Sequence, residues 1–331
     1  MRAMETNVWT SAETEHLARA VLGAPSVHNL QPWLLDLAPG RAWLRERGDL
    51  VLPHHDPDGR DRAASCGAAV VNLELAVRTL GRVAEVVLLP NEHRPEVVAR
   101  VDAHRSSAPT HEEVRLHRAI AHRASHRRPF GLQPVRDSAA RRVVSAARTS
   151  GVDARLVTRK PDIAAVAKLL HVAAGKFQSD SGYQRELSLW TIRDEATHRH
   201  GVGIPAGRIP AGAVPWAGLV RRATEVPHWT EIEERLAAGV LVVLVTPGDT
   251  RLDHLRAGYA LELAWLTAVD LGLVGAVLTQ PLHVETVRAK LGEELSLTGV
   301  PHVLMRIGHS SEPEPPRVRR STEELVQHGE D

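Results

Sequence analysis

The segment Pro25–Trp33 reads PSVHNLQPW and concentrates turn-forming residues and short polar side chains between an expected helix and an expected strand. A loop of this composition can present backbone amides and polar groups to a ligand. The alternative is a purely structural turn, in which Asn29 and Gln31 hydrogen-bond the backbone. Composition alone does not choose between a binding loop and such a turn.

A second polar segment, Arg123–Phe130, reads RASHRRPF and ends a basic run that begins at Arg118. Guanidinium groups carry several N–H donors in a rigid fork, so convergent arginines are suited to anchoring a phosphate. The alternative is a solvated basic face or helix end. Nucleic acid is a poor candidate ligand because aromatic residues are not interleaved in the run. The chain's 41 Lys and Arg also balance its 40 Asp and Glu.

The elements that must position these segments alternate between helices and strands along the chain. Apolar periodicity predicts helices at about 11–22, 61–80, 112–121, 137–148, 162–178, 183–194 and 251–271, a short helix after His283, and strands near 33–37, 41–46, 83–89, 96–102, 239–245, 273–278 and 302–307.

Two of these helices are alike. The stretch from Gly67 to Gly81 and the stretch from Gly258 to Gly272 have the same glycine spacing around a mostly apolar helix, and each ends in Leu-Gly. A helix that is apolar nearly all round is buried on several sides, so we expect the two helices to form the centre of the molecule or to pack on each other. A repeat this long indicates two fused copies of one unit with a site at the seam. Chance similarity between two buried helices is the alternative.

The first segment resembles the P-S-x-x-N-x-Q-P-W motif of flavin-dependent nitroreductases. Together with Asp56–Arg60 and Ser65–Ala69 it looks like the Acg-type actinobacterial branch. Arg123–Phe130 is similar to the R-x-S-x-R-x-F motif that begins a nitroreductase subunit, yet here it follows the other motif and lies in the other half of the chain. Homodimers of this family build each FMN site from both subunits. The resemblance therefore implies one complete FMN site per chain and the loss of a second.

The fold that the resemblance implies is an α+β, nitroreductase-like fold with two fused, pseudo-equivalent domains that imitate the family homodimer. We expect the first half to span 1–105, a linker to span 106–112, and the second half to span 113–331 with the RASHR motif, a lid loop and a basic C-terminal tail.

The resemblance also assigns FMN contacts to both halves. Arg123, Ser125 and Arg127 are expected near the phosphate, the ribityl chain and the N1–O2 edge of the flavin, where a cation favours the reduced form. Thr279 and Gln280 fall in the turn that faces flavin N5, and either Arg319 or Arg320 is expected to reach the phosphate. The complete set expected to bind FMN is Pro25, Ser26, Asn29, Arg123, Ser125, Arg127, Thr279, Gln280, Arg319 and Arg320. Trp33 is expected in the core.

Two functions fit these expectations. The first is an FMN-dependent oxidoreductase that takes electrons from NADH or NADPH and reduces small nitroaromatic or quinone-like acceptors. The second is a non-catalytic protein that sequesters FMN, because the long Gly- and Pro-rich loop from Arg199 to Trp216 could act as a lid that blocks nicotinamide access.

Other sites are not expected. The chain has no apolar run of 18 residues and no signal peptide, so we expect a cytoplasmic protein with no membrane partner, and a monomer, since it imitates a dimer by fusion. A metal is not expected at His54, His55 and Asp56, because adjacent histidines point apart. The lone Cys66 fits a reducing compartment and is expected to pack within a helix. Gly201–Ala206 loosely fits a dinucleotide fingerprint but lacks the preceding strand.

Overall fold

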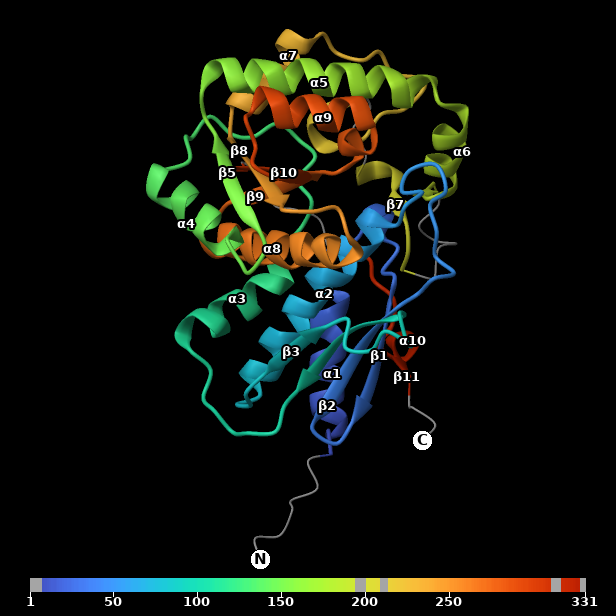
Figure 1. The fold of residues 1–331 in the computed structure, drawn as a ribbon, viewed down its shortest axis with the longest axis vertical. Helices are drawn as coiled ribbons and strands as arrows, with labels where there is room; N and C mark the ends of the chain where they lie inside the picture. The colour runs from blue at the N-terminus through green and yellow to red at the C-terminus, as the bar shows by residue number, and fades with distance from the viewer. Residues whose placement is uncertain (1–7, 194–200, 209–213, 311–316, 328–331) are drawn as a thin grey trace, which may run out of the picture.

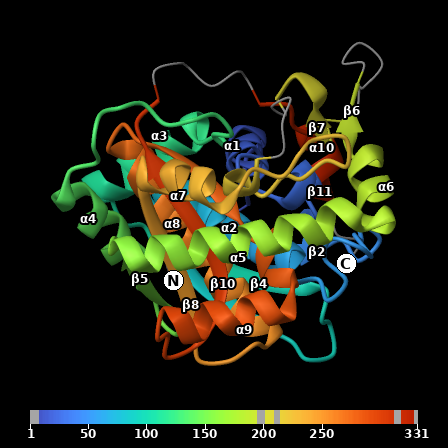
Figure 2. The ribbon, with the colours of Figure 1, turned by 90° about the horizontal axis from the view of Figure 1, so that it is seen from above.

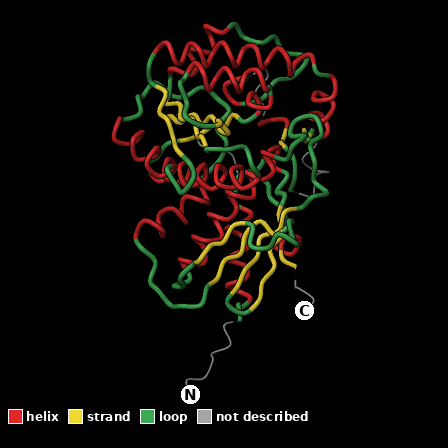
Figure 3. Tube along the Cα trace, in the orientation of Figure 1, coloured by secondary structure: helices red, strands yellow, loops and turns green. Residues whose placement is uncertain are grey.

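The structure is a computed structural model that describes residues 8–193, 201–208, 214–310 and 317–327. It contains two larger sheets, each covered by helices, which lie one above the other with helices at the seam between them (Figures 1 and 3). The first sheet has the order β11-β1-β2-β4-β3 and the second has the order β5-β8-β10-β9. The predicted α+β class is confirmed.

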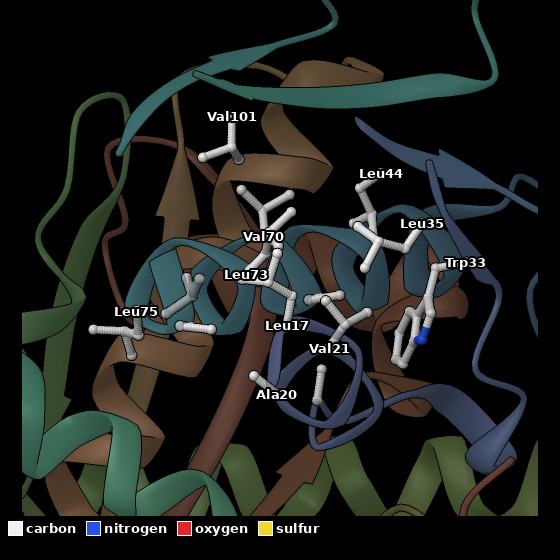
Figure 4. Packing of buried hydrophobic residues seen from close by; sticks show 14 of the residues in the cluster. Leu17, Ala20, Val21, Trp33, Leu35, Leu44, Val70, Leu73, Leu75 and Val101 are labelled. Atoms are coloured by element: carbon white, nitrogen blue, oxygen red, sulfur yellow. The ribbon is translucent and has the colours of Figure 1, made fainter. Parts of the chain in front are cut away.

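The first half packs two helices on one face of its sheet, which is built from β1 (Trp33–Ala38), β2 (Arg41–Glu46), β3 (Glu85–Leu88) and β4 (Val97–Asp102). Alternate strand residues such as Leu35, Leu44 and Val101 point to the same side, where they meet α1 (Ser11–Leu22) and α2 (Arg60–Thr79) (Figure 4). Trp33 is 1% exposed in this core, so its predicted placement is confirmed.

The sheet of the second half is buried on both faces. Its strands are β5 (Asp153–Val157), β8 (Val240–Thr246), β9 (Val274–Leu278) and β10 (Val300–Gly308). Leu241 and Val243 of β8 face α5 (Lys160–Ser179), α7 (Trp229–Ala237) and α9 (Glu285–Glu294), and Val242 and Leu244 face α4 (Asp137–Ala147) and α8 (Arg251–Asp270). Figure 2, seen from above, shows α5 crossing over this sheet. The unbroken apolar run of β8 is therefore explained by a strand covered on both sides.

The shorter elements connect the halves and close the molecule. They are η1 (Val27–Asn29), α3 (His111–His122), α6 (Ser181–Leu189), β6 (Thr191–Ile192), β7 (Ile204–Pro205), η2 (Ala206–Arg208), η3 (Pro215–Ala217), η4 (Gln280–His283), α10 (Thr322–Leu325) and β11 (Val326–Gln327). Among the described residues, no helix is both long enough and apolar enough to cross a membrane.

The two repeat helices, α2 and α8, pack directly on each other between the sheets. They meet through the glycines that open each repeat: a Cβ added to Gly67 would lie 2.0 Å from Leu255 O, and one added to Gly258 would lie 1.8 Å from Ala64 O. The backbones are thus in contact, with room for no side chain at either glycine. The expectation that these helices pack on each other is confirmed. Cys66, next to Gly67, is fully buried in α2, as expected, and burial raises the pKa of its thiol.

The end of the chain returns to the first half. Strand β11 pairs in parallel with β1, with Leu35 opposite Val326, so residues near the C-terminus extend the first sheet. Helix α3, which begins at the end of the expected linker, packs on both α2 and α8. The expected boundaries at 1–105, 106–112 and 113–331 stay a prediction.

The glycine contact between α2 and α8 predicts that Gly67→Ala lowers the free energy of unfolding by at least about 1–3 kcal/mol, because the new methyl group meets backbone that cannot move independently. The matched control is Gly175→Ala in α5, where a Cβ would meet nothing within 4 Å. Alanine there is expected to be neutral or to stabilise by up to about 1 kcal/mol. Urea denaturation measures both, and equal stability of the two variants would refute the close contact.

Candidate functional site

A cavity of about 120 Å³, partly open to solvent, lies between the two halves. Of the residues that the sequence assigns to an FMN site, those lining this cavity are Pro25, Ser26, Ser125, Arg127, Thr279 and Gln280. Two motifs about a hundred residues apart in the sequence therefore meet at one cavity. Asn29, Arg123, Arg319 and Arg320 are not brought to its wall.

The remaining wall is largely apolar and comes from elements on both sides. Leu261 and Trp265 of α8 and Val277 of β9 lie on one side. Ile204, from the loop expected to form a lid, and Leu219, which follows that loop, also line the cavity. An apolar slot with a few convergent polar groups is typical of a site for a flat cofactor. Residues 199–200 and 209–213 of the expected lid lie outside the described residues.

The loop after α1 has an unusual backbone. His28, Asn29 and Gln31 all have positive φ values of 47°, 57° and 52°, although none is glycine. Such conformations cost on the order of 1–3 kcal/mol each and persist where the surroundings hold them. Ser26 contributes by accepting a hydrogen bond at Oγ from the backbone N–H of Gln31, 3.0 Å away. The loop is thus a strained segment held in one shape.

Asn29 and Gln31 hold that loop to distant backbone. Asn29 Nδ2 donates to the carbonyl oxygens of Gly201 at 2.9 Å and Val318 at 3.1 Å, and Gln31 Nε2 donates to Gly201 O at 2.8 Å. The alternative of a structural turn is confirmed for these two side chains. Asn29 does not line the cavity, and its predicted contact with FMN stays a prediction.

Arg123 directly follows α3 as its C-cap residue and is 1% exposed. Its Nη2 donates to Gly23 O at 3.1 Å, its guanidinium lies 4.5 Å from the ring of Trp265, and its Nε is 3.6 Å from Glu262 Oε1. Burial lowers the pKa of Arg123 and raises that of Glu262 to about 7. The side chain therefore points to the end of α1 and to α8, and its assignment to the phosphate stays a prediction that this geometry does not favour.

The C-terminal arginines bind the same end of α1. Arg319 donates from Nε to Leu22 O and from Nη1 to Asn29 Oδ1, both at 2.6 Å, and Arg317 Nη1 donates to Gly23 O at 2.9 Å. Cations are favoured there because carbonyl groups at the C-terminus of a helix carry partial negative charge. Arg320 uses its backbone N–H to bind Gln31 Oε1 at 3.0 Å. The basic tail thus connects the end of the chain to the strained loop.

Ser125 and Arg127 reach the cavity because their segment lies along β9. Ser125 forms a bridge with Gly275, and the N–H of His126 donates to Gly275 O at 2.8 Å. Gly275 has to be small, since a Cβ there would lie 2.7 Å from Trp265 Nε1. Strand β9 therefore positions Ser125, Arg127 and the ring of Trp265 at the cavity wall.

A buried polar cluster that the sequence did not predict forms one end of the cavity. A single oxygen, Oδ2 of Asp61, lies 2.6 Å from Thr279 Oγ1, 3.0 Å from His55 Nε2 and 3.2 Å from His283 Nε2. Burial alone would raise the pKa of Asp61, but the charge of His283 and the hydrogen bonds from His283 and His55 hold it well below its usual value. Burial opposes the protonated form of His283, whereas the negative charge of Asp61 favours it. The pKa of His283 is raised overall. The cluster therefore holds a buried ion pair.

The ligand atoms of His55, Asp61 and His283 lie within 4.8 Å of one another, as those of a metal site would. A metal-bound imidazole normally donates its second N–H to a partner, whereas the buried His55 Nδ1 has no hydrogen-bond partner within the described part of the chain. Both imidazoles also hydrogen-bond the same carboxylate oxygen. We therefore interpret the group as a hydrogen-bonded cluster, and the expectation of no metal stays a prediction.

His28 adds a further polar group to the cavity wall. Its Nε2 is buried without a hydrogen-bond partner among the described residues, and burial lowers the pKa of the ring well below its usual value. Gln280 Nε2 donates to the hydroxyl of the buried Tyr183. A neutral imidazole with an unpartnered nitrogen at the wall is suited to exchanging a hydrogen bond with a bound molecule.

One sequence signal could have located the cluster. Asp61 follows the motif Asp56–Arg60, and the carboxylate of Asp56 accepts hydrogen bonds from the backbone N–H groups of Asp61 at 3.1 Å and Arg62 at 2.9 Å. Asp56 therefore caps α2, which is the usual role of an acid at this position. Asp61 lies in the first turn of α2, where an acid is also favoured by the helix dipole. Only its place in a helix that the sequence predicts to be buried on several sides indicates that its carboxylate needs a buried partner.

Known proteins resemble this chain over nearly its whole length, although no family model matches it. The NAD(P)H nitroreductase Rv3131 of Mycobacterium tuberculosis is 31% identical, with 98% of this chain and 94% of that protein covered. The NAD(P)H nitroreductase acg of the same organism is 28% identical, with 91% of each chain covered. A crystal structure of a nitroreductase with bound FMN from Bacteroides fragilis is 12% identical, has a TM-score of 0.42, and covers 65% of this chain and 98% of its own.

The identity to Rv3131 and the similarity to acg agree with the resemblance of Pro25–Trp33 and Arg123–Phe130 to the nitroreductase motifs, and the predicted relationship to the Acg-type branch is confirmed. The chain belongs to the NAD(P)H nitroreductase family.

Proposed function

We propose that the protein is an FMN-dependent NAD(P)H oxidoreductase that binds one FMN in the cavity between its halves and reduces small nitroaromatic or quinone-like acceptors. The observation that carries this proposal is the meeting of Pro25 and Ser26 from the first half with Ser125 and Arg127 from the second at one cavity wall. Family membership and the NAD(P)H nitroreductase names of its relatives support the same conclusion.

The residues around the cavity fit FMN chemically. Arg127 and Ser125 offer a guanidinium and a hydroxyl to an anionic phosphate, and the apolar surfaces of Leu261 and Trp265 suit a flat ring system. His28, whose Nε2 is without a hydrogen-bond partner among the described residues, lines the same space. FMN would supply reversible two-electron redox chemistry there, and the protein would supply orientation, polarity and exclusion of water.

One site per chain follows from the repeat. Counted from the paired glycines Gly67 and Gly258, the cavity residues Ala64 and Leu261 correspond to Leu255 and Val70 in the partner helix. Both corresponding side chains are 0% exposed and belong to the core of the first half. Core packing thus occupies the place where a second, symmetry-related FMN would bind, and we infer one FMN per chain.

Sequestration of FMN is the second candidate function, and a specific contact favours it. The side-chain amides of Asn29 and Gln31 donate hydrogen bonds to Gly201 O, and that of Asn29 also donates to Gly203 O. These bonds hold the segment that brings Ile204 to the cavity wall. A segment fixed over the cavity could keep a nicotinamide from stacking on the flavin. The two functions differ in whether NADH or NADPH reduces the bound FMN.

Arg127→Ala is expected to weaken FMN binding by about 1.5–3 kcal/mol, roughly a 10- to 150-fold rise in Kd, because a charged hydrogen bond to phosphate is lost. Arg128→Ala is the matched control, since Arg128 is exposed and does not line the cavity. Flavin fluorescence titration of the apoprotein measures Kd, and the absorbance of denatured wild-type protein is expected to give about one FMN per chain. Equal Kd values for the two variants would remove Arg127 from the site.

Anaerobic addition of NADH and then NADPH is expected to bleach the bound FMN of the wild-type protein, because an oxidoreductase must accept a hydride. Gln31→Asn tests the alternative: asparagine tolerates the left-handed backbone but is one methylene too short to reach Gly201. The exposed Gln133→Asn is its control. Wild-type FMN that is inert to both donors, and becomes reducible in Gln31→Asn alone, would establish sequestration.

A further inference from the structure

The cluster around Asp61 separates the cavity proposed for FMN from a second, smaller cavity. Asp61, Ala64 and Thr279 line both spaces, and the second has about 20 Å³, which is room for about one water molecule. His283 lines only the second cavity, where it is joined by His254 and His302. Asp61 thus borders both cavities, and the imidazole of His283 lies on the side of the second cavity.

The second cavity leads to a polar network that reaches solvent. His254 Nε2 lies 2.8 Å from Asp249 Oδ1, and Arg288 Nη2 donates to Asp249 Oδ2 at 2.8 Å. The side chain of Asp249 is 29% exposed. A polar cavity with room for water can pass protons between such groups. Titratable side chains therefore continue from the surface at Asp249, along the second cavity, to Asp61 at the wall of the first.

A buried ion pair is an expensive feature, because each charge must leave water. Asp61 and His283 have only 7% and 8% of their side-chain surface exposed, and three donors converge on one carboxylate oxygen instead of being spread over both. Thr279 and His55 fix the orientation of that oxygen. The protonated imidazole of His283 thus contacts the carboxylate of Asp61, and Asp61 also lines the first cavity.

We propose that His283 and Asp61 supply the proton that completes reduction of an acceptor in the cavity, an inference that rests on the proposed function. A quinone that accepts a hydride equivalent, two electrons and one proton, from the reduced flavin becomes a hydroquinone monoanion. The proton on His283 passes through Asp61 to that oxygen and gives the neutral hydroquinone. His283 then regains a proton from solvent along the second cavity, so charge and atoms balance.

The pair is surrounded by charged and titratable groups from each element packed against it, and these set its titration. They are His28 on η1, His55 and Asp56 before α2, Arg60 on α2, Tyr183 and Glu186 on α6, Asp249 and His254 at the start of α8, Arg288 on α9, His302 on β10, and Arg127 across the cavity. Asp61 and Asp56 favour the protonated form of His283, and burial and Arg60 oppose it.

The test uses His283→Gln, which keeps a hydrogen-bond donor but carries no titratable proton and leaves the walls of the first cavity unchanged. FMN-loaded protein is reduced photochemically under anaerobic conditions and mixed with 1,4-benzoquinone or with ferricyanide, which takes electrons without a proton. We expect flavin oxidation by benzoquinone to slow on the order of 10²-fold and oxidation by ferricyanide to stay within about twofold of wild type. The exposed His93→Gln is the control and should match wild type with both acceptors.

Two further readouts separate proton supply from a structural role. The wild-type rate with benzoquinone should fall as pH rises through the raised pKa of His283, because the donor loses its proton, and this fall should be absent in His283→Gln. Histidine NMR of the apoprotein should show that Asp61→Asn lowers the pKa of His283. Equal slowing with both acceptors, or no slowing with benzoquinone in a flavin-loaded variant, would overturn the proposal. A wild-type chain that binds no FMN would instead overturn the proposed function.

Discussion

The contact of α2 with α8 through Gly67 and Gly258 sets the geometry on which the rest of the molecule depends. Because a Cβ on either glycine would enter the partner's backbone, the helices approach as closely as main chains can. One or two turns from these glycines, residues on the same helix faces line the cavity. They are Asp61 and Ala64 on α2 and Leu261 and Trp265 on α8. The cavity is thus formed where the two helices separate. Both halves contribute to its wall because each half contains one of the two helices.

Around this crossing the polar side chains divide into those that hold the fold and those that face the cavity. Arg123, Arg317 and Arg319 all donate to carbonyl groups at or near the end of α1, where the strained loop begins. The positive φ values of that loop are stabilised by Asn29 and Gln31, which also bind the C-terminal segment. The end of the chain therefore helps to hold the motif that forms the first wall of the cavity.

Much of the fold could be predicted from sequence because it depends on local pattern. The predicted helix at 11–22 and strand at 41–46 coincide with α1 and β2, and the glycine repeat predicted the contact of α2 with α8. Strand β5 was not predicted, because DARLV mixes charged and apolar residues and gains its place only by pairing with β8. Helix α7 was likewise missed, and its apolar residues pack on α5 from a distance in sequence.

The site was predicted in part for a similar reason. Motif resemblance identifies which residues lie near the cavity, but the direction of a long side chain depends on which carbonyl or carboxylate is closest after folding. Arg127 reaches the wall and Arg123, four residues earlier, does not. Arg123 is the C-cap residue of α3, and its guanidinium donates to Gly23 O. The cluster of His55, Asp61 and His283 joins segments that are more than two hundred residues apart and matches no local spacing.

The buried pair of Asp61 and His283 also bears on the choice between catalysis and storage. Binding FMN requires shape, apolar surface and phosphate contacts, and the residues proposed for these contacts, Leu261, Trp265, Ser125 and Arg127, do not include this pair. An ion pair removed from water contributes little to stability, and apolar residues of similar size would serve a storage site as well or better. A titratable path from solvent to the cavity is useful only if protons are consumed there. The polar wall that the fold maintains beside Thr279 therefore favours turnover over sequestration.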